Sequence, residues 1–292
     1  MAWFDRAAGG PGLSIAYSRS DAGALPKSLF GYDVIARLGE GAASTIYAVS
    51  DPRSGQVYAL KHVRRRSAKD TRFIVQLINE FEVCQRLSHP GLRRVIDLKI
   101  SRSLLMRISE AALIMEMVDG TPLDQQKPQE LPQIIDCFMQ TARALSAMHY
   151  QLYVHCDLKP NNILTDAQGR VKLIDFGQAV KTGTIKERIQ GTPDFIAPEQ
   201  VRLKPVTFRT DVFNFGATLY WALSGQKIPT LFTVPKRQRD VVLECRFPSP
   251  RDLNPAVPRL LSDLVMQCVR VDPLHRPRDM GEILNRLDSV NL

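Results

Sequence analysis

The sequence has few cysteines, and no two of them form a CxxC pair. The five stand at positions 84, 137, 156, 245 and 268 of 292 residues. An odd number at these spacings argues against a disulfide framework and against a structural zinc site. A reducing compartment suits such a chain, so we expect a cytoplasmic protein.

Long apolar runs are also missing. Residues 111–114 and 213–223 come closest, and Asn214 interrupts the second, which is typical of a buried helix. Both are far shorter than the roughly 20 residues that cross a bilayer. The N-terminus has no basic start followed by an apolar core, which argues against a secretory signal. We therefore expect no membrane span.

Charge is unbalanced toward the basic side, with a formal net charge of +9. The basic residues gather at 64–66 and at 236–239. A solvated surface is the simpler interpretation, and attraction to nucleic acid or anionic lipid is the alternative. No aromatic residues interleave with the basic ones. The sequence therefore does not firmly indicate a nucleic-acid partner.

The order of periodicities predicts two packed lobes of α+β class. Residues 1–28, rich in Gly, Ala and Ser, predict a flexible leader. Alternating patterns then predict antiparallel strands over 32–41, 44–51, 56–63, 95–100 and 111–118. Helical patterns are clearest over 71–88, 132–151, 211–224, 257–269 and 278–288. We expect a small sheet lobe with one main helix at 29–118 and a larger, mainly helical lobe at 119–292.

A glycine-rich segment at 38–44 lies between two predicted strands. Glycines let backbone amides approach phosphate oxygens closely, although a tight hairpin is the plain alternative. The strand–turn–strand context disfavours a dinucleotide fold. Lys61 follows on an inward-facing strand and needs a counterion, which Glu80 on the next helix can supply. As an isolated observation, Lys61 is more simply interpreted as a surface lysine.

Two further loops carry carboxylates beside apolar strands, at 155–162 and 175–177. Phosphoryl transfer needs metal ligands and a group that orients the attacking hydroxyl. Asp175 and Asn162 suit Mg²⁺, Asp157 suits the hydroxyl, and Lys159 suits the charge that builds on the γ-phosphoryl group. Each could be a turn residue by itself, but all four segments in this order argue against coincidence.

On these motifs the chain resembles the eukaryotic-type protein kinases over about residues 30–290. The shared motifs are GEGAAS at 39–44, VYALK at 57–61, HCDLKPNN at 155–162, DFG at 175–177 and GTPDFIAPE at 191–199. Ser44 in place of a third glycine and a sparse C-terminal lobe look most like the bacterial, Hanks-type Ser/Thr branch. The resemblance implies a bilobal kinase fold, with ATP bound by 29–118. Residues 119–292 would carry the catalytic loop, activation segment and peptide-binding surface.

The resemblance also implies ATP with Mg²⁺, or Mn²⁺, as cofactors and Ser or Thr of proteins as acceptors. We expect a monomer or a weak dimer. The implied catalytic residues are Lys61, Glu80, Asp157, Lys159 and Thr192. The implied metal ligands are Asn162 and Asp175. The implied nucleotide contacts are Leu38, Gly39, Glu40, Gly41, Ala42, Ala43, Ser44, Ile46, Ala59, Lys61, Met115, Glu116, Val118 and Leu164. The implied structural residues are His155, Phe176, Glu199, Asp211 and Arg276, and His155 and Phe176 would form a regulatory spine with Cys84 and Val95.

Two positions depart from the family pattern. Cys156 stands where an arginine usually precedes the catalytic aspartate and reads a phosphate on the activation loop. With a neutral thiol there, we expect that no buried cation waits for a phosphate, so switching by phosphorylation of Thr182 or Thr184 is in doubt. Asn161 stands where many kinases that prefer basic substrates carry a glutamate. A basic consensus peptide is therefore not predicted.

Two other function classes share parts of this pattern. A pseudokinase scaffold would keep the fold, but such proteins usually lose the lysine, the loop aspartate or the metal aspartate, and all are present here. A small-molecule phosphotransferase of the aminoglycoside or choline kinase type would share the HxDxxxxN loop. It would lack the segment from DFG to APE and the GTP motif with Thr192. The sequence therefore favours a non-RD Ser/Thr protein kinase.

Overall fold

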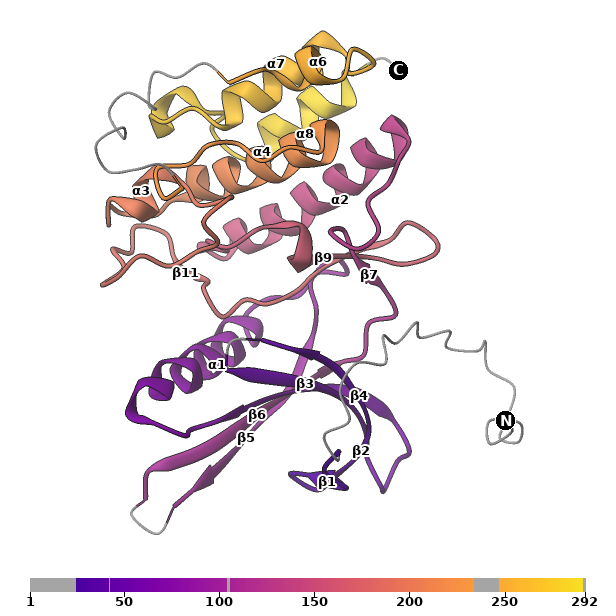
Figure 1. Ribbon diagram of the computed structural model, residues 1–292, viewed down its shortest axis with the longest axis vertical. Coiled ribbons are helices and arrows are strands. Elements are labelled where there is room, and N and C mark those ends of the chain that lie inside the picture. Colours follow the sequence, from indigo (N-terminus) through magenta and orange to yellow (C-terminus); the bar gives the residue numbers. More distant parts are fainter. Residues whose placement is uncertain (1–24, 42, 104–105, 234–246, 291–292) are drawn as a thin grey trace.

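Alternating side chains between Ser28 and Glu116 build an antiparallel sheet of six strands, in the order β1-β2-β3-β4-β6-β5 (Figure 1). The computed structural model describes residues 25–41, 43–103, 106–233 and 247–290. The strands are β1 (Ser28–Leu29), β2 (Tyr32–Glu40), β3 (Ser44–Ser50), β4 (Val57–Arg64), β5 (Val95–Arg102) and β6 (Ile108–Glu116). All five predicted strands are present.

The sheet begins earlier than the sequence predicts. Ser28 pairs with Asp33 and Leu29 with Tyr32, which makes a short edge strand that starts at the last residue of the predicted leader of 1–28. Lys27 adds a backbone bond, because its carbonyl accepts the N–H of Val34 at 3.1 Å. A strand this short has no alternation to read, so only its pairing identifies it. Residues 1–24 of the predicted leader lie outside the described residues.

The main helix of this lobe, α1 (Thr71–Cys84), follows the short 3₁₀ helix η1 (Ala68–Asp70) and packs on the sheet. Its buried face consists of Ile74, Leu77, Glu80, Val83 and Cys84. The helix ends four residues before the predicted residue 88. After Cys84 the N–H groups of Arg86 and Leu87 bond to carbonyls three residues back, which tightens the turn and stops the helix.

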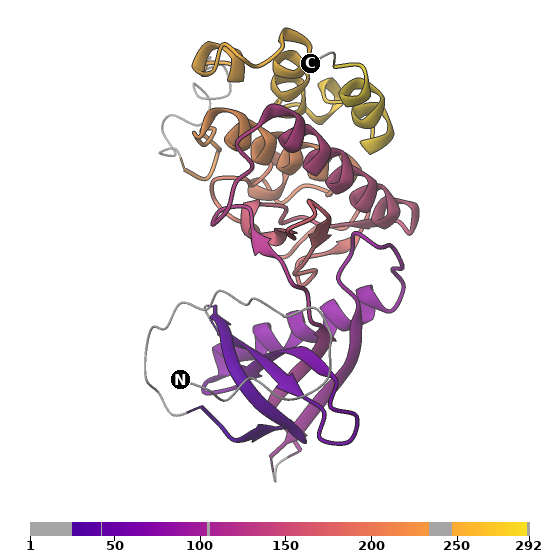
Figure 2. The same ribbon diagram turned by 90° about the vertical axis from the view of Figure 1, so that its right-hand side faces the viewer.

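Helices dominate the rest of the chain and stack away from the sheet (Figure 2). The longer ones are α2 (Leu131–Tyr150), α4 (Phe208–Ser224), α7 (Arg259–Cys268) and α8 (Met280–Asp288). The shorter ones are α3 (Pro198–Val201), α6 (Pro250–Leu253) and η4 (Pro273–His275). Helix α4 is buried on nearly all sides, and a Cβ on its Gly216 would lie 2.4 Å from the Cβ of Cys268. Only glycine allows α4 and α7 to approach so closely. The bilobal α+β class predicted from the sequence is confirmed.

Small sheets hold the loops between the two lobes. Strand β9 (Ile163–Thr165) pairs with β10 (Val171–Leu173) on one side and β7 (Thr121–Pro122) on the other, and β8 (Tyr153–Val154) pairs with β11 (Val180–Lys181). The 3₁₀ helix η2 (Pro160–Asn162) lies between β8 and β9. These pairings fix both ends of the two carboxylate-bearing loops. Among the described ranges, no helix combines the length and the apolar character needed to cross a membrane.

Candidate active site

The ammonium of Lys61 joins the two lobes. It projects from β4, and its Nζ lies 2.7 Å from Oε2 of Glu80 on α1 and 2.8 Å from Oδ1 of Asp175 after β10. Glu80 is fully buried. The predicted ion pair between Lys61 and Glu80 is therefore present, and Asp175 extends it into the C-terminal lobe.

The charges of this cluster stabilise one another. Burial alone would lower the pKa of Lys61, but the carboxylates of Asp175 and Glu80 outweigh it and raise that pKa above its ordinary value. The ammonium of Lys61 is in turn the main cause that holds the pKa of Asp175 well below its usual range. Both shifts keep the groups ionised, so the site presents a fixed cation beside a fixed anion.

Further contacts hold α1 against the loop at 175–177, and the sequence analysis missed them. The Nη2 of Arg93 lies 3.8 Å from Oε1 of Glu80, which also accepts the N–H of Phe176 at 3.3 Å. Asn79 donates from Nδ2 to the carbonyls of Gly177 and Ala179, at 3.4 and 2.9 Å. The loop groups lie about a hundred residues from Asn79 and Glu80 in the chain, and no local pattern relates them.

Asp157 lies at the centre of a second polar cluster. Its Oδ1 accepts both the N–H and the Oγ1–H of Thr192, each at 2.8 Å, and its Oδ2 lies 3.1 Å from Nζ of Lys159. Lys159 also donates to Oγ1 of Thr192 at 2.9 Å. The three predicted residues thus form a closed ring of hydrogen bonds that leaves the carboxylate few ways to turn.

A buried carboxylate on α4 supports the loop that carries Asp157. Asp211 accepts the N–H of Cys156 on Oδ1 at 2.9 Å, and the N–H of His155 and Nε2 of His149 on Oδ2, both at 2.8 Å. Burial would raise the pKa of Asp211, but the hydrogen bonds and charges of its neighbours, His149 foremost, lower it overall. Cys156 has a φ of 66°. This left-handed conformation is costly for a residue with a side chain, and the bonds to Asp211 stabilise it. The role of His149 was not predicted.

The predicted spine residues pack together. The rings of His155 and Phe176 meet edge to face with centroids 5.6 Å apart. Phe176, Cys84 and Val95 belong to one buried apolar cluster, which spans both lobes. The DFG loop is therefore anchored by apolar contacts as well as by ions.

The predicted nucleotide residues lie on or beside β2, β3, β4, β6 and β9. Ala59 is buried opposite Met115, and Ile46 pairs in register with both Gly39 and Lys61. Leu38, Glu40, Gly41, Ala43 and Ser44 lie at or beside the β2–β3 turn, whereas Ala42 lies outside the described residues. Leu164 is buried on β9, and Glu116 and Val118 lie at and just beyond the end of β6.

Asn162 and Asp175 offer oxygen ligands at neighbouring positions. The side-chain Nδ2 of Asn162 donates to the backbone carbonyl of Asp157 at 2.9 Å. The backbone carbonyl of Asn162 accepts the N–H of Ile174, next to Asp175, at 3.0 Å. Because Nδ2 makes this bond, the side-chain Oδ1 of Asn162 is directed away from the Asp157 carbonyl. An amide oxygen beside an ionised carboxylate suits a hard cation such as Mg²⁺. Groups of three or more His, Cys, Asp or Glu that could hold a metal do not occur in the described part of the chain.

The activation segment, between the DFG and APE motifs, contains a buried cation. Lys186 is only 8% exposed, and its Nζ donates to the carbonyl of Gln178 at 2.7 Å. Its charge opposes the rise that burial causes in the pKa of the Cys156 thiol. The expectation that no buried cation near Cys156 waits for a phosphate stays a prediction, since Lys186 is buried but already has a hydrogen-bond partner. This cation bonds within its own segment.

Glu199 and Arg276 form the pair predicted from their motifs. Their two parallel hydrogen bonds measure 2.8 and 2.9 Å, and both residues are buried. The remaining guanidinium donors reach the carbonyls of Arg209, Arg270 and Val271. All five donors of Arg276 are thus used.

Replacing Arg276 with methionine should lower the free energy of unfolding by about 3–5 kcal/mol, because Glu199 would stay buried without its partner. Arg276→Lys should be nearly as damaging, since an ammonium cannot reproduce the planar fork. Urea denaturation would measure both variants. Arg278→Met, at an exposed arginine two residues away, is the control. An equally small loss in Arg276→Met and in this control would contradict the expectation.

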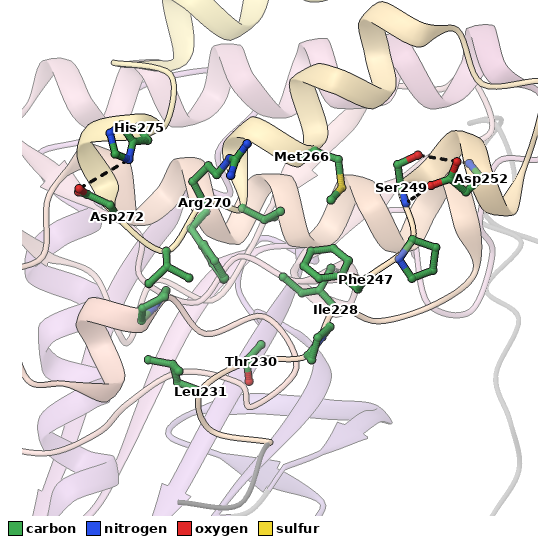
Figure 3. Close-up of a pocket in the computed structure, with 16 residues that line it drawn as sticks. Ile228, Thr230, Leu231, Phe247, Ser249, Asp252, Met266, Arg270, Asp272 and His275 are labelled. Atoms are coloured by element: carbon green, nitrogen blue, oxygen red, sulfur yellow. Dashed lines mark hydrogen bonds and ion pairs between the residues drawn. The ribbon is translucent and has the colours of Figure 1, made fainter. Parts of the chain in front are cut away.

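A cavity of about 850 Å³ lies in the C-terminal lobe, away from these clusters (Figure 3). Pro198, Phe213 and Met266 contribute to its wall. Polar residues on the wall pair with one another: Ser249 with Asp252, and His275 with Asp272. None of the residues predicted for ATP, metal or catalysis lines it, so this cavity is separate from the candidate active site.

Comparison with known proteins gives a consistent result. The family model described as "Protein kinase domain" matches residues 32–286. Serine/threonine-protein kinase PknA of Mycobacterium tuberculosis is 30% identical over 261 residues, which cover 86% of this chain and 59% of that protein. Serine/threonine-protein kinase PrkC of Bacillus subtilis is 26% identical over 257 residues, 84% of this chain and 38% of that protein. The chain thus spans well under two thirds of the length of either relative.

Proposed function

Because this chain belongs to the protein kinase domain family, we propose that it transfers the γ-phosphoryl group of ATP to Ser or Thr hydroxyls of proteins. The observation that carries the proposal is the complete charged set around the two loops. Lys61 contacts both Glu80 and Asp175, and Asp157 is oriented by Thr192 and Lys159. A scaffold that only binds partners would not need to keep both clusters assembled.

Asp157 would act on the acceptor hydroxyl. Its carboxylate orients the hydroxyl and takes the proton as the oxygen bonds to the γ-phosphorus, while the bond from that phosphorus to the bridging oxygen of ADP breaks. Lys159 lies beside Asp157 and would stabilise the charge on the phosphoryl oxygens in flight. Lys61, held by Glu80, would orient the α- and β-phosphates.

Asn162 and Asp175 would hold a divalent cation, Mg²⁺ or Mn²⁺. When bound, such an ion supplies neutralisation of phosphate charge. The contribution of the protein is to keep both oxygen ligands in place, which Lys61 does for Asp175 and the Asp157 carbonyl does for Asn162.

Serine and threonine acceptors, rather than tyrosine, are supported by Lys159 two residues after Asp157 and by the names of the relatives. The direct test is incubation of the chain with ATP, Mg²⁺ and a general acceptor protein, followed by mapping of phosphosites. Asp157→Asn is the matched control, because it keeps the shape of the side chain and removes the base. Phosphate on Ser or Thr that depends on Asp157 is expected. Transfer only to a small molecule would instead support the aminoglycoside or choline kinase alternative.

The finer part of the proposal is a non-RD mode in which the activation segment needs no phosphate. Hydrogen bonds that the activation segment makes without a phosphate support this mode. The N–H of Thr182 donates to the carbonyl of Leu152 at 2.9 Å, and the carbonyl of Thr184 accepts the N–H of Val206 at 3.0 Å. The buried ammonium of Lys186 donates to the carbonyl of Gln178 in the same segment.

The double variant Thr182→Ala, Thr184→Ala, made as dephosphorylated protein, should therefore keep kcat/KM within about threefold of the parent, less than about 0.7 kcal/mol. Steady-state kinetics with varied acceptor would measure this. A fall of a hundredfold, about 2.7 kcal/mol, would show that a phosphate is bound here, with Lys181, Lys186 or Arg188 as its partners.

A further inference from the structure

Gln200 occupies a buried position between the two loops of the candidate site. It lies on α3, directly after Glu199, and is only 3% exposed. Its Nε2 donates to the carbonyl of Cys156 at 2.7 Å and to that of Gln190 at 3.1 Å. Its Oε1 accepts the N–H of Ala197 at 3.0 Å and Nδ2 of Asn214 at 3.2 Å. A side-chain amide has two donors and two acceptor sites, so all four are used.

The first carbonyl belongs to the peptide unit that joins Cys156 to Asp157. The N–H of that same unit donates to Nδ1 of His155 at 3.2 Å. The plane of this peptide is therefore held at its oxygen by Gln200 and at its nitrogen by His155. Since the plane sets the direction in which the Asp157 side chain leaves the backbone, Gln200 acts on the orientation of the carboxylate.

The second carbonyl, of Gln190, lies two residues before Thr192, whose N–H and hydroxyl bond to Asp157. Gly191 between them has a φ of 133°, and a Cβ there would lie 3.2 Å from Nε2 of Gln200. The backbone thus passes very close to the amide, in a conformation that favours glycine. One side chain therefore ties together the two segments that meet at Asp157.

We propose that Gln200 is a positioning residue for phosphoryl transfer, which fixes Asp157 and Thr192 relative to each other and does so without a phosphate on the activation segment. This inference rests on the proposed kinase function. An amide suits the task because both target groups are carbonyl oxygens, which need N–H donors and would repel a carboxylate. A neutral side chain also avoids the desolvation cost of burying a charge.

The test compares Gln200→Met and Gln200→Glu with the same substitutions at Gln140. Both Gln200 variants lose the paired N–H donors while keeping nearly the same length. Gln140 is a matched control, because its amide also bridges two backbone groups, the carbonyl of Gly169 and the N–H of Val171, in the turn between β9 and β10. We expect the Gln200 variants to lower kcat about 10²-fold, as a displacement of about 1 Å at the reacting groups does. The ATP dissociation constant should stay within about threefold, because no nucleotide contact changes.

Hydrogen–deuterium exchange supplies a readout that does not depend on activity. Backbone amides at 186–192 should exchange at least about tenfold faster in the Gln200 variants, whereas those of β4 should not change. An unchanged kcat, unchanged exchange at 186–192, or an equal loss of kcat in the Gln140 variants would overturn the proposal. A general structural role would likewise overturn it, and would appear as weakened ATP binding and faster exchange in both lobes. If the parent chain itself transfers no phosphate, the proposed function fails, and the exchange data still decide whether Gln200 joins the two segments.

Discussion

Replacing Asp175 with alanine should lower kcat about 10³-fold or more. The substitution removes the carboxylate that would hold the divalent cation, and it also removes one of the two anions that position Lys61. Metal-ion catalysis supplies several kcal/mol of transition-state stabilisation, and each 1.36 kcal/mol or so corresponds to a factor of ten in rate. Initial rates of phosphate transfer at saturating ATP and Mg²⁺ would measure the loss.

The fold should tolerate this change. The side chain of Asp175 is 39% exposed, so alanine there leaves no large cavity, and Lys61 keeps Glu80 as its counterion. The thermal midpoint should therefore remain close to that of the parent. Asp263→Ala, at an exposed aspartate on α7, is a matched control and should leave kcat unchanged. A near-normal kcat in Asp175→Ala would show that the metal ligand lies elsewhere.

Changing Lys61 to methionine should lower kcat/KM by about 10³-fold, roughly 4 kcal/mol of transition-state stabilisation. Methionine keeps much of the apolar stem but cannot orient phosphates. Glu80 would lose its nearest cation in a fully buried position, which is ordinarily a serious cost. Arg93 and the N–H of Phe176 remain beside its other oxygen, so we expect the chain to stay folded.

Lys99→Met provides the comparison for this variant. Lys99 lies on β5 in the same sheet, pairs with Asp97 and is 40% exposed, so its loss should not affect turnover. Kinetics with varied ATP and a denaturation curve would separate an effect on chemistry from one on stability. If Lys61→Met turned over ATP at the parental rate, another lysine would have to orient the phosphates.

Much of the fold follows from local patterns in the sequence. Alternation identified the five longer strands of the sheet, and helical periodicity identified α1, α2, α4, α7 and α8, because these patterns report which face of an element is buried. The patterns failed where the cause was not local. Strand β1 is recognised only by its pairing with β2, and the end of α1 is set by a turn rather than by a change in periodicity.

The candidate site also has features that local sequence patterns predict and features that they do not. Lys61, Asp157 and Asp175 stand in short motifs, and the sequence by itself was enough to predict that they would serve one site together with Glu80. The groups that hold them do not lie in motifs. Arg93 beside Glu80, Asn79 on the loop after Asp175, and His149 on Asp211 are paired only in the folded chain.

Only the tertiary structure decided which residues hold the loops at 155–162 and 175–177 in place, because these loops are fixed by hydrogen bonds in the interior. A buried polar group must find a partner, but the partner can come from any segment that passes close to it. Lys186 reaches the neighbourhood of Cys156, and Gln200 reaches two carbonyls that lie 44 and 10 residues away in the chain. Neither residue differs in sequence from an ordinary surface lysine or glutamine. The candidate reactive residues can thus be predicted from the sequence, whereas their orientation is set by the packing of the two lobes.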